Sequence, residues 1–284
     1  MPLTDGGRAR GGAATAAEPG VAAGRSGASG CSTAVRWQLL LEPQGRSGPE
    51  NMAVDAALLE RADRMGEAFL RLYRFDPPCL SFGRNEASGG YDRAAIARLA
   101  IDVVRRPTGG AAVWHEQELT YAVAAPIAAL GGLRQAYHAI HGCLAAALRA
   151  LGVSPTLAPD RPLPPSTALY RPAGCFGSSV GGEILVGGRK LVGSAQVRRG
   201  GAFLQHGSIL LDGSQDLIQA VSRKPQAASA ATTLSEELGR RVTWDEVVEA
   251  LGRAWRTGVT SPNLPQPPPT SIALFSDPAW TWRR

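Results

Sequence analysis

Two runs of alternating apolar residues, separated by Gly187 and Gly188, constrain the fold of this chain more than any other feature of its sequence. The segment 183–198 reads EILVGGRKLVGSAQVR, and the two glycines can adopt the positive φ angles that a tight hairpin turn requires. The next segment, AFLQHGSILL at 202–211, has the composition of a further strand. The second half of the chain is therefore expected to contain a β-hairpin followed by another strand.

Helical patterns occur before and after this hairpin. Residues 51–65 place apolar side chains at helical spacing with Asn51 as the expected N-cap, and the long pattern at 134–151 ends at Gly152. Thr243 begins a third helix with the spacing of a capping box. The other predicted elements are a short helix at 92–100, strands at 36–42, 70–75 and 79–83, a strand–turn–strand unit at 101–116, and Pro-rich loops at 154–166 and 263–271. This mixture predicts an α+β fold with a mixed sheet flanked by helices.

The start of the chain differs in composition from the rest. Residues 1–34 are rich in Gly, Ala, Ser and Arg and contain almost no large apolar side chains. Such a segment cannot offset the entropy that it would lose on ordering, so we expect a disordered tail. No linker divides the remainder, and residues 35–284 are predicted to form one domain.

Composition excludes several classes of protein. The net charge of +6 favours an acidic partner, but basic residues are not interleaved with aromatic ones, which argues against nucleic-acid binding. No apolar run is long enough to span a membrane, and the first residues do not resemble a secretory signal. The four cysteines form no CxxC pair, and His138 and His141 share a helix face without a third ligand, so no metal is expected. A reducing cytoplasmic location fits these features.

Cys175 is the cysteine whose surroundings suggest reactivity. It lies in RPAGCFGSSVGG, among glycines and short polar residues, whereas Cys79 and Cys143 lie in apolar segments typical of core cysteines. Cys31 belongs to the tail. Cys175 is therefore a candidate nucleophile, and a loop cysteine with no function is the alternative.

Lys190 is one of only two lysines in the sequence, the other being Lys224. Lys190, Val192 and Ser194 are expected on one face of a strand, where an edge lysine that prevents aggregation is the ordinary interpretation. A lysine close to a cysteine would instead favour the thiolate, which is the form that attacks a thioester. Lys190 follows Cys175 closely enough in the sequence for such a contact.

A third feature is the sequence RRPTGGAAVWHE, which begins at Arg105 and Arg106. Its guanidinium groups and the backbone N–H groups of Gly109 and Gly110 can approach an anion, although an ordinary glycine turn beside two surface arginines has the same pattern. His115 ends this segment and His206 lies in a later strand, where a buried, hydrogen-bonded histidine is the default interpretation.

Three segments together carry a family resemblance. VVRRPTGGAAVWHEQELTYAV, GCFG and GGRKLVGSAQVRRGGAFLQHGSILL occur in an order and spacing that resemble the catalytic domain of the lipoate–protein ligases, octanoyltransferases and biotin ligases. With NMAVDAALLE near the start and WTWRR at the end, the resemblance covers about residues 36–284. The family turn has a third glycine where this chain has Ala111. The resemblance implies an α+β catalytic domain with a mixed sheet.

The resemblance is greatest to the cysteine-dependent octanoyltransferases and implies their mechanism. Octanoate would pass from acyl carrier protein, through a thioester on Cys175, to the lipoyl-bearing lysine of an acceptor such as the glycine cleavage H protein or another lipoyl domain. Lys190 would lower the pKa of the thiol. The family positions that line the acyl pocket correspond to Arg106, Gly109, Gly110, His115, Gly193, Ser194 and His206, and Arg105 completes the substrate-binding set. No cofactor would be needed.

Other functions fit the same residues. An ATP-dependent lipoate ligase would use ATP and magnesium, with Lys190 at the acyl-adenylate and Cys175 incidental. Transfer between lipoyl domains is a related possibility. A protein without catalytic activity that recognises acyl groups or carrier domains belongs to a different class. Formation of a covalent acyl adduct without ATP distinguishes the first function from the others.

Overall fold

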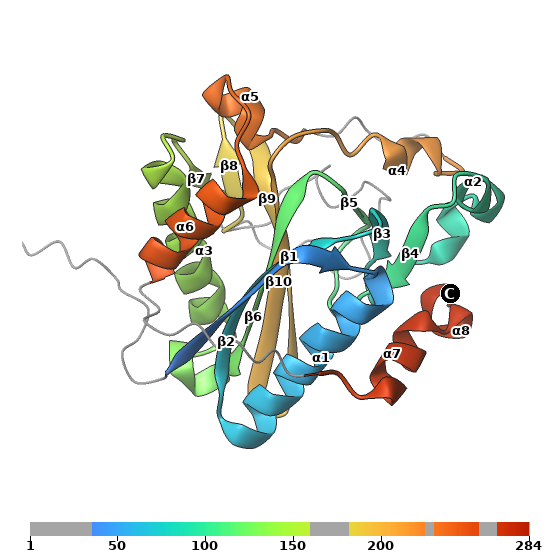
Figure 1. Cartoon of the computed structure of the whole chain (residues 1–284), viewed down its shortest axis with the longest axis horizontal. Coiled ribbons are helices and arrows are strands. Elements are labelled where there is room, and N and C mark those ends of the chain that lie inside the picture. Colours follow the sequence, from blue (N-terminus) through green and yellow to red (C-terminus); the bar gives the residue numbers. More distant parts are fainter. Residues whose placement is uncertain (1–35, 160–181, 225–229, 256–265, 284) are drawn as a thin grey trace, which may run out of the picture.

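The computed structural model describes residues 36–159, 182–224, 230–255 and 266–283. The tail predicted at residues 1–34 and Cys175 both lie outside this described part. The described residues form two sheets with helices on their outer faces (Figure 1). The predicted α+β fold with a mixed sheet is confirmed.

The larger sheet contains seven strands in the order β1-β2-β6-β10-β9-β8-β7. β1 and β2 are parallel, and every other neighbouring pair in this sheet is antiparallel. Its strands are β1 (Trp37–Arg46), β2 (Ala68–Phe75), β6 (Glu118–Pro126), β7 (Thr156–Leu157), β8 (Ile184–Val186), β9 (Arg189–Arg199) and β10 (Ala202–Leu210). The hairpin predicted from the sequence is β8–β9, and both glycines at its turn have positive φ.

The smaller sheet lies across one face of the larger one and has the order β4-β3-β5. β3 (Cys79–Phe82) pairs in parallel with β4 (Asp102–Arg105) and antiparallel with β5 (Val113–His115). The predicted strand–turn–strand unit is thus present, but its two strands do not pair with each other. β3 lies between them, and this follows from long-range packing that a local pattern does not contain.

Helices cover both faces of the larger sheet. α3 (Leu133–Ala150) and α6 (Trp244–Trp255) pack on one face through an apolar cluster that includes Leu70, Tyr121 and Phe203. α1 (Gly48–Met65) packs on the other face, where the next residues along the strands, including Phe69 and Leu204, point. Figure 1 shows α1 on one side of the sheet and α3 and α6 on the other. The shorter helices are α2 (Arg93–Arg98), α4 (Leu217–Ala220), α5 (Leu234–Leu238), α7 (Pro269–Ser276) and α8 (Pro278–Thr281), with 3-10 turns η1 (Ser88–Gly90) and η2 (Ile127–Leu130).

The ends of the helices confirm one prediction and correct another. Thr243 and Glu246 form the predicted capping box before α6, with hydrogen bonds in both directions. The N-cap of α1 is Ser47 rather than Asn51, because a Ser47–Glu50 pair starts the helix one turn earlier. Asn51 is buried inside α1, where its side-chain amide donates to the carbonyls of Arg46 and Arg74.

The two Pro-rich segments are only partly loops. Thr156 and Leu157 form the short strand β7, and Pro269 begins α7. Proline at a first helical position loses no hydrogen bond, because the N–H that it lacks has no partner inside the helix.

Candidate functional site

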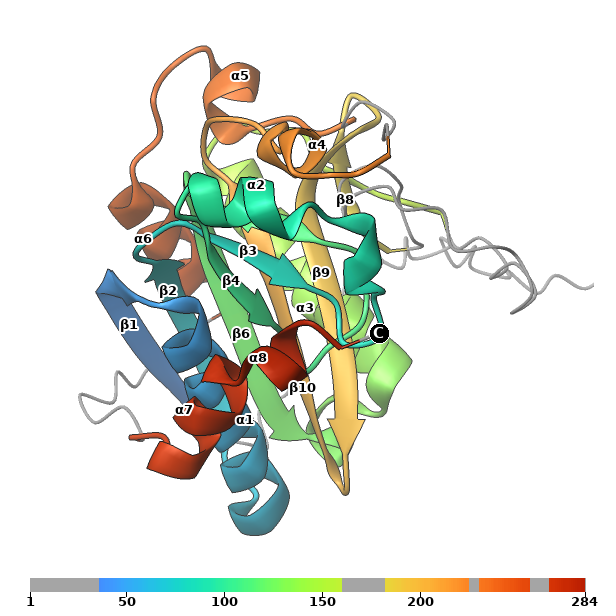
Figure 2. The same cartoon turned by 90° about the vertical axis from the view of Figure 1, so that its right-hand side faces the viewer.

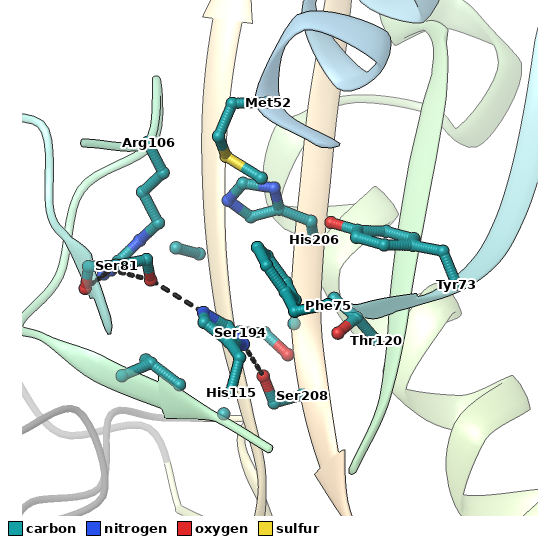
Figure 3. A pocket seen from close by; sticks show the side chains of 14 residues that line it. Met52, Tyr73, Phe75, Ser81, Arg106, His115, Thr120, Ser194, His206 and Ser208 are labelled. Atoms are coloured by element: carbon teal, nitrogen blue, oxygen red, sulfur yellow. Dashed lines mark hydrogen bonds between the residues drawn. The ribbon is translucent and has the colours of Figure 1, made fainter. Parts of the chain in front are cut away.

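A pocket lies between the two sheets, where α1 and the middle of the larger sheet meet β3 and β5 (Figure 3). Its cavity volume is about 30 Å³, so the pocket is narrow. The residues that line it are Met52, Tyr73, Phe75, Ser81, Arg106, Val113, His115, Thr120, Gly193, Ser194, Ala195, His206, Gly207 and Ser208.

His206 projects into this pocket from β10 and is held at both ring nitrogens. Nδ1 lies 2.8 Å from Oδ2 of Asp55, and Nε2 lies 2.6 Å from the hydroxyl of Thr108. Burial lowers the pKa of His206, and the hydrogen bond that its Nδ1 donates to Asp55 offsets only part of this effect. The ring is therefore neutral, with Nδ1 donating to Asp55 and Nε2 accepting from Thr108.

Asp55 is the centre of a buried polar network on the α1 face of the sheet. Arg71 donates to its Oδ1 at 2.8 Å, and Tyr73 donates its hydroxyl to Oδ2 at 3.0 Å. Arg71 also pairs with Glu42 and donates to Asn51. Burial would raise the pKa of Asp55, but the hydrogen bond from His206 and the charge of Arg71 outweigh it and lower the pKa. Arg46 also pairs with Glu42, so the network contains two guanidinium and two carboxylate groups.

His115 forms a second histidine–carboxylate pair on the opposite wall. Its Nδ1 lies 2.6 Å from Oε1 of Glu118, and its Nε2 lies 2.7 Å from the hydroxyl of Ser81. The ring stacks on Phe75 with 4.1 Å between centroids. Figure 3 shows the bond between His115 and Ser81, and a longer one from His115 to Ser208.

Arg106 lines the pocket but is held by its own surroundings. Its guanidinium donates to the carbonyls of Ser81, Gly109 and Ala111 and to the Ser81 hydroxyl. This fixes the glycine turn, where Gly110 has a φ of 89°. A Cβ on Gly83 would lie 1.8 Å from the carbonyl oxygen of Gly110, so close packing against the turn requires glycine at position 83.

The polar side chains of the lining are all bonded within the protein. Tyr73, Ser81, Arg106, His115, Thr120, Ser194, His206 and Ser208 each make at least one such hydrogen bond. Polar groups that already have partners gain little from a polar ligand, whereas apolar surface gains from any apolar ligand. The lining therefore favours an apolar group, although eight of its fourteen residues are polar.

A second polar cluster lies on the α3 face of β9. Nζ of Lys190 donates to Oε1 of Glu183 at 2.6 Å, and both side chains are almost fully buried, with 3% and 2% exposed. Ser194 bonds the hydroxyl of Tyr121 at 2.6 Å and Nε2 of His141 at 2.8 Å. Burial raises the pKa of Tyr121 to about 12 and lowers that of His141 to about 3, so both are neutral at pH 7.

Two of the four cysteines lie in the described part of the chain, and both are core residues, as predicted. Cys79 is in β3 and Cys143 in α3, each within an apolar cluster. Burial raises the pKa of the Cys79 thiol well above its ordinary value, and neighbouring Asp102 adds to this, so it is a poor nucleophile.

The predicted site residues are distributed unevenly. Arg106, His115, Gly193, Ser194 and His206 all line the pocket. Gly109 and Gly110 form the turn beneath Arg106, and Lys190 lies three residues before Gly193 on β9.

Arg105 faces away from the pocket. It is fully buried, and its guanidinium donates to the carbonyls of Gly83, Glu86 and the C-terminal residues Trp280, Thr281 and Arg283. Arg105 therefore fixes the C-terminal segment to the smaller sheet.

Sequence reasoning missed three carboxylates that support the site: Asp55, Glu118 and Glu183. Asp55 lies inside α1 and Glu183 directly before β8, and no local sequence pattern distinguishes either residue. A signal for Glu118 was its spacing, since it follows His115 by three residues across a turn.

Neither a metal site nor a membrane span is found in the part of the chain that the structure describes. There, no three His, Cys, Asp or Glu side chains are grouped so that they could hold an ion. None of the helices placed by the structure has the length and apolar character needed to cross a membrane.

Comparisons with known proteins agree with this geometry. The family model of the lipoyl protein ligase A/B catalytic domain matches residues 47–256. Octanoyltransferase LipM of Symbiobacterium thermophilum is 39% identical over 245 residues, which cover 79% of this chain and 87% of that protein. Octanoyltransferase LipM of Bacillus subtilis is 33% identical over 241 residues, covering 78% of this chain and 86% of the relative.

Solved structures share the fold at lower identity. A crystal structure of lipoate-protein ligase A bound with ATP has a TM-score of 0.68 at 21% identity, over 87% of this chain and 98% of that one. A bi-partite lipoate protein ligase from Thermoplasma acidophilum has a TM-score of 0.67 at 19% identity, over 87% and 96% of the two chains.

Proposed function

Because this chain belongs to the lipoyl protein ligase A/B catalytic domain family, we propose that it is an octanoyltransferase that acts through a thioester on Cys175. The donor is an octanoyl thioester of acyl carrier protein, and the acceptor is the lipoyl-bearing lysine of a lipoyl domain or of the glycine cleavage H protein. Both partners are proteins of the cytoplasm, where the enzyme acts.

One observation carries the proposal. The chain belongs to a family of acyl-transferring enzymes, and the polar groups that line its pocket are already hydrogen-bonded within the protein. A saturated octanoyl chain has no polar group to offer such a wall, and it gains by leaving water. The relatives named above that cover most of this chain are octanoyltransferases.

The reaction has two steps. The thiolate of Cys175 attacks the donor thioester carbonyl, the acyl–sulfur bond to the carrier breaks, and the carrier leaves as a thiol after taking a proton. The acceptor amine then attacks the new thioester, loses a proton as the amide forms, and releases the Cys175 thiolate. No nucleotide or metal is required, because the thioester is already activated.

Lys190 is proposed to stabilise the thiolate of Cys175. Its ammonium is held in β9 by Glu183, which follows Cys175 closely in the sequence. A buried ammonium stabilises a nearby negative charge more strongly than an exposed one, since solvent screens it less. Glu183 also restricts the position of the ammonium group.

The test is the intact mass of the protein after mixing with octanoyl carrier protein in the absence of ATP. The wild-type mass is expected to increase by one octanoyl group, and hydroxylamine should remove it. Cys175→Ala should show no adduct, while Cys31→Ser, a matched change of another cysteine, should be acylated normally. Activity that survives in Cys175→Ala and requires ATP with release of AMP would contradict the proposal.

Lys190 is tested by the pH dependence of Cys175 alkylation. In Lys190→Met the pKa of the Cys175 thiol should be higher, so its reaction with iodoacetamide should begin at a higher pH than in the wild type. At pH 7 the rate should be about tenfold lower for each unit by which that pKa increases. Superimposable profiles for the two proteins would remove Lys190 from this role.

A further inference from the structure

Several arginines on the surface of this protein form salt bridges with neighbouring acids: Arg61 with Glu67, Arg189 with Glu236 and Glu237, Arg240 with Glu246, and Arg253 with Glu249. Others, such as Arg74, Arg149, Arg198 and Arg199, form none within the described part. Among these unpaired arginines, four lie around the smaller sheet and are here called the arginine face: Arg84, Arg93, Arg223 and Arg283.

Hydrogen bonds connect the segments that carry the arginine face. Arg283 donates to the carbonyl of Arg84, and its own carbonyl accepts from Ser88 of η1. Gly90, at the other end of η1, accepts from the backbone N–H of Arg223 at 2.9 Å. In Figure 2, α2, η1 and the C-terminal end lie on the same side of the molecule.

Aromatic side chains hold these guanidinium groups in place. Arg93 lies 4.3 Å from the ring centroid of Trp282, and Arg283 lies 3.9 Å from that of Trp280. Nε of Arg223 donates to the carbonyl of Tyr91 at 3.1 Å. Burial and the nearby charge of Arg84 lower the pKa of Arg283, as expected where like charges are crowded.

The carboxylates near the arginine face accept hydrogen bonds from backbone N–H groups and from Tyr91. Asp92 accepts from the first backbone N–H groups of α2, and Asp277 does the same for α8. Glu86 is buried and accepts from Tyr91 and from the backbone of Gly83 and Ala112. Within the described part of the chain these carboxylates form no ion pair with the four arginines, whose positive charge favours an acidic partner.

The arginine face adjoins the pocket. The backbone N–H of Arg84 donates to the carbonyl of Thr108 at 2.7 Å, and the side chain of Thr108 bonds His206 inside the pocket. Arg84 also follows Ser81, which lines the pocket, in the same segment. A protein bound at this face would lie beside the proposed acyl site.

We propose that the arginine face is the docking surface for the acidic carrier protein that donates the acyl group. This inference rests on the proposed function, and it assigns the donor to this face rather than the acceptor. The planar guanidinium of arginine binds a carboxylate by two parallel hydrogen bonds, which suits the surface of an acidic protein.

The test compares two charge-reversal variants of equal net charge. Arg84→Glu/Arg93→Glu changes the arginine face, and Arg198→Glu/Arg199→Glu changes two exposed arginines at the far end of β9. Initial rates of Cys175 acylation are measured with octanoyl carrier protein and with a small octanoyl thioester of N-acetylcysteamine, each at several salt concentrations. Thermal unfolding checks that both variants are folded.

The arginine-face variant should raise the KM for octanoyl carrier protein about tenfold and remove most of its salt dependence, because steering by charge is lost. Its rate with the small thioester should match that of the wild type, and the control variant should change neither rate. An equal loss in both variants, or a higher KM for the acceptor protein alone, would overturn the assignment. Absence of acylation by either thioester in the wild type would instead reject the proposed function.

Discussion

His206 and His115 face the same pocket, and each has a carboxylate at Nδ1 and a hydroxyl at Nε2. The carboxylates differ in what supports them. Asp55 is paired with the buried guanidinium of Arg71 and accepts a hydroxyl as well. Glu118 has no arginine or lysine partner among the described residues, and its buried Oε2 has no hydrogen-bond partner there.

This difference separates a fixed wall from an adaptable one. Asp55 and Arg71 form a fully buried ion pair, so moving either one would leave a buried charge unpaired. The His115 wall consists of a partly satisfied carboxylate and a stacked Phe75 ring, and such a wall can shift at lower cost. We expect the ligand to be positioned against the first wall and its length to be selected by the second.

The largest expected effect is that of Asp55→Asn. Loss of the anion leaves Arg71 buried with Glu42 as its remaining acid, and the free energy of unfolding should fall by about 3 kcal/mol. Glu118→Gln should lower the free energy of unfolding by less than about 1 kcal/mol, because no arginine or lysine is left without its partner. Urea denaturation of both variants measures the difference, and similar losses would show that the two walls are equivalent.

Histidine without a carboxylate offers the next comparison. His141 bonds Ser194 rather than an acid, and burial lowers its pKa to about 3. The unfolded chain binds a proton near pH 6.5 and the folded chain does not, so the free energy of unfolding decreases as the pH falls below 6.5. The contribution of this residue is about 1.4 kcal/mol per pH unit.

The check is the slope of unfolding free energy against pH between 6 and 4.5. His141→Gln should have a slope smaller than the wild type by about 1 kcal/mol per unit, since its side chain takes up no proton. Parallel curves would mean that His141 is protonated in the folded protein.

Phe75→Leu tests the adaptable wall directly. A smaller side chain opens space beside His115, so the preference for acyl chains should shift from octanoyl toward decanoyl. The ratio of the two rates should change about tenfold, which is the discrimination expected from one or two methylene groups in an apolar pocket. Met52→Ala, on the α1 side of the same pocket, is the matched comparison, and a larger shift in that variant would place length selection on the other wall.

Local patterns predicted the elements well, but not their partners. The β8–β9 hairpin and the capping box of α6 depend on neighbouring residues and were visible in the sequence. The insertion of β3 between β4 and β5 depends on distant packing, and no local pattern encodes it. The mixture of local patterns predicted an α+β fold with a mixed sheet, and the family resemblance implied the same fold.

The same distinction applies to the site. The scarcity of lysine drew attention to Lys190, but its partner Glu183 directly precedes β8, and the pairing of β8 with β9 is set by register. Arg105 and Arg106 were taken together, although adjacent residues of a strand point to opposite sides. Only Arg106 reaches the pocket, and the alternation alone would have separated the two. The roles of Cys175 and Lys190 stay predictions.

The smallest expected effect is that of Ser47→Ala, at the start of the helix that carries Met52 and Asp55 to the pocket. Ser47 donates its hydroxyl to Glu50 at 2.6 Å, and its backbone N–H donates to the same carboxylate. The variant keeps the backbone bond, so the cost should be below about 1 kcal/mol. A normal rate of acylation with a small loss of stability would show that the Asp55 network, rather than the helix cap, fixes this wall. A loss as large as that of Asp55→Asn would mean that the position of α1 depends on its first turn, and the contrast between the two walls would then arise from the helix.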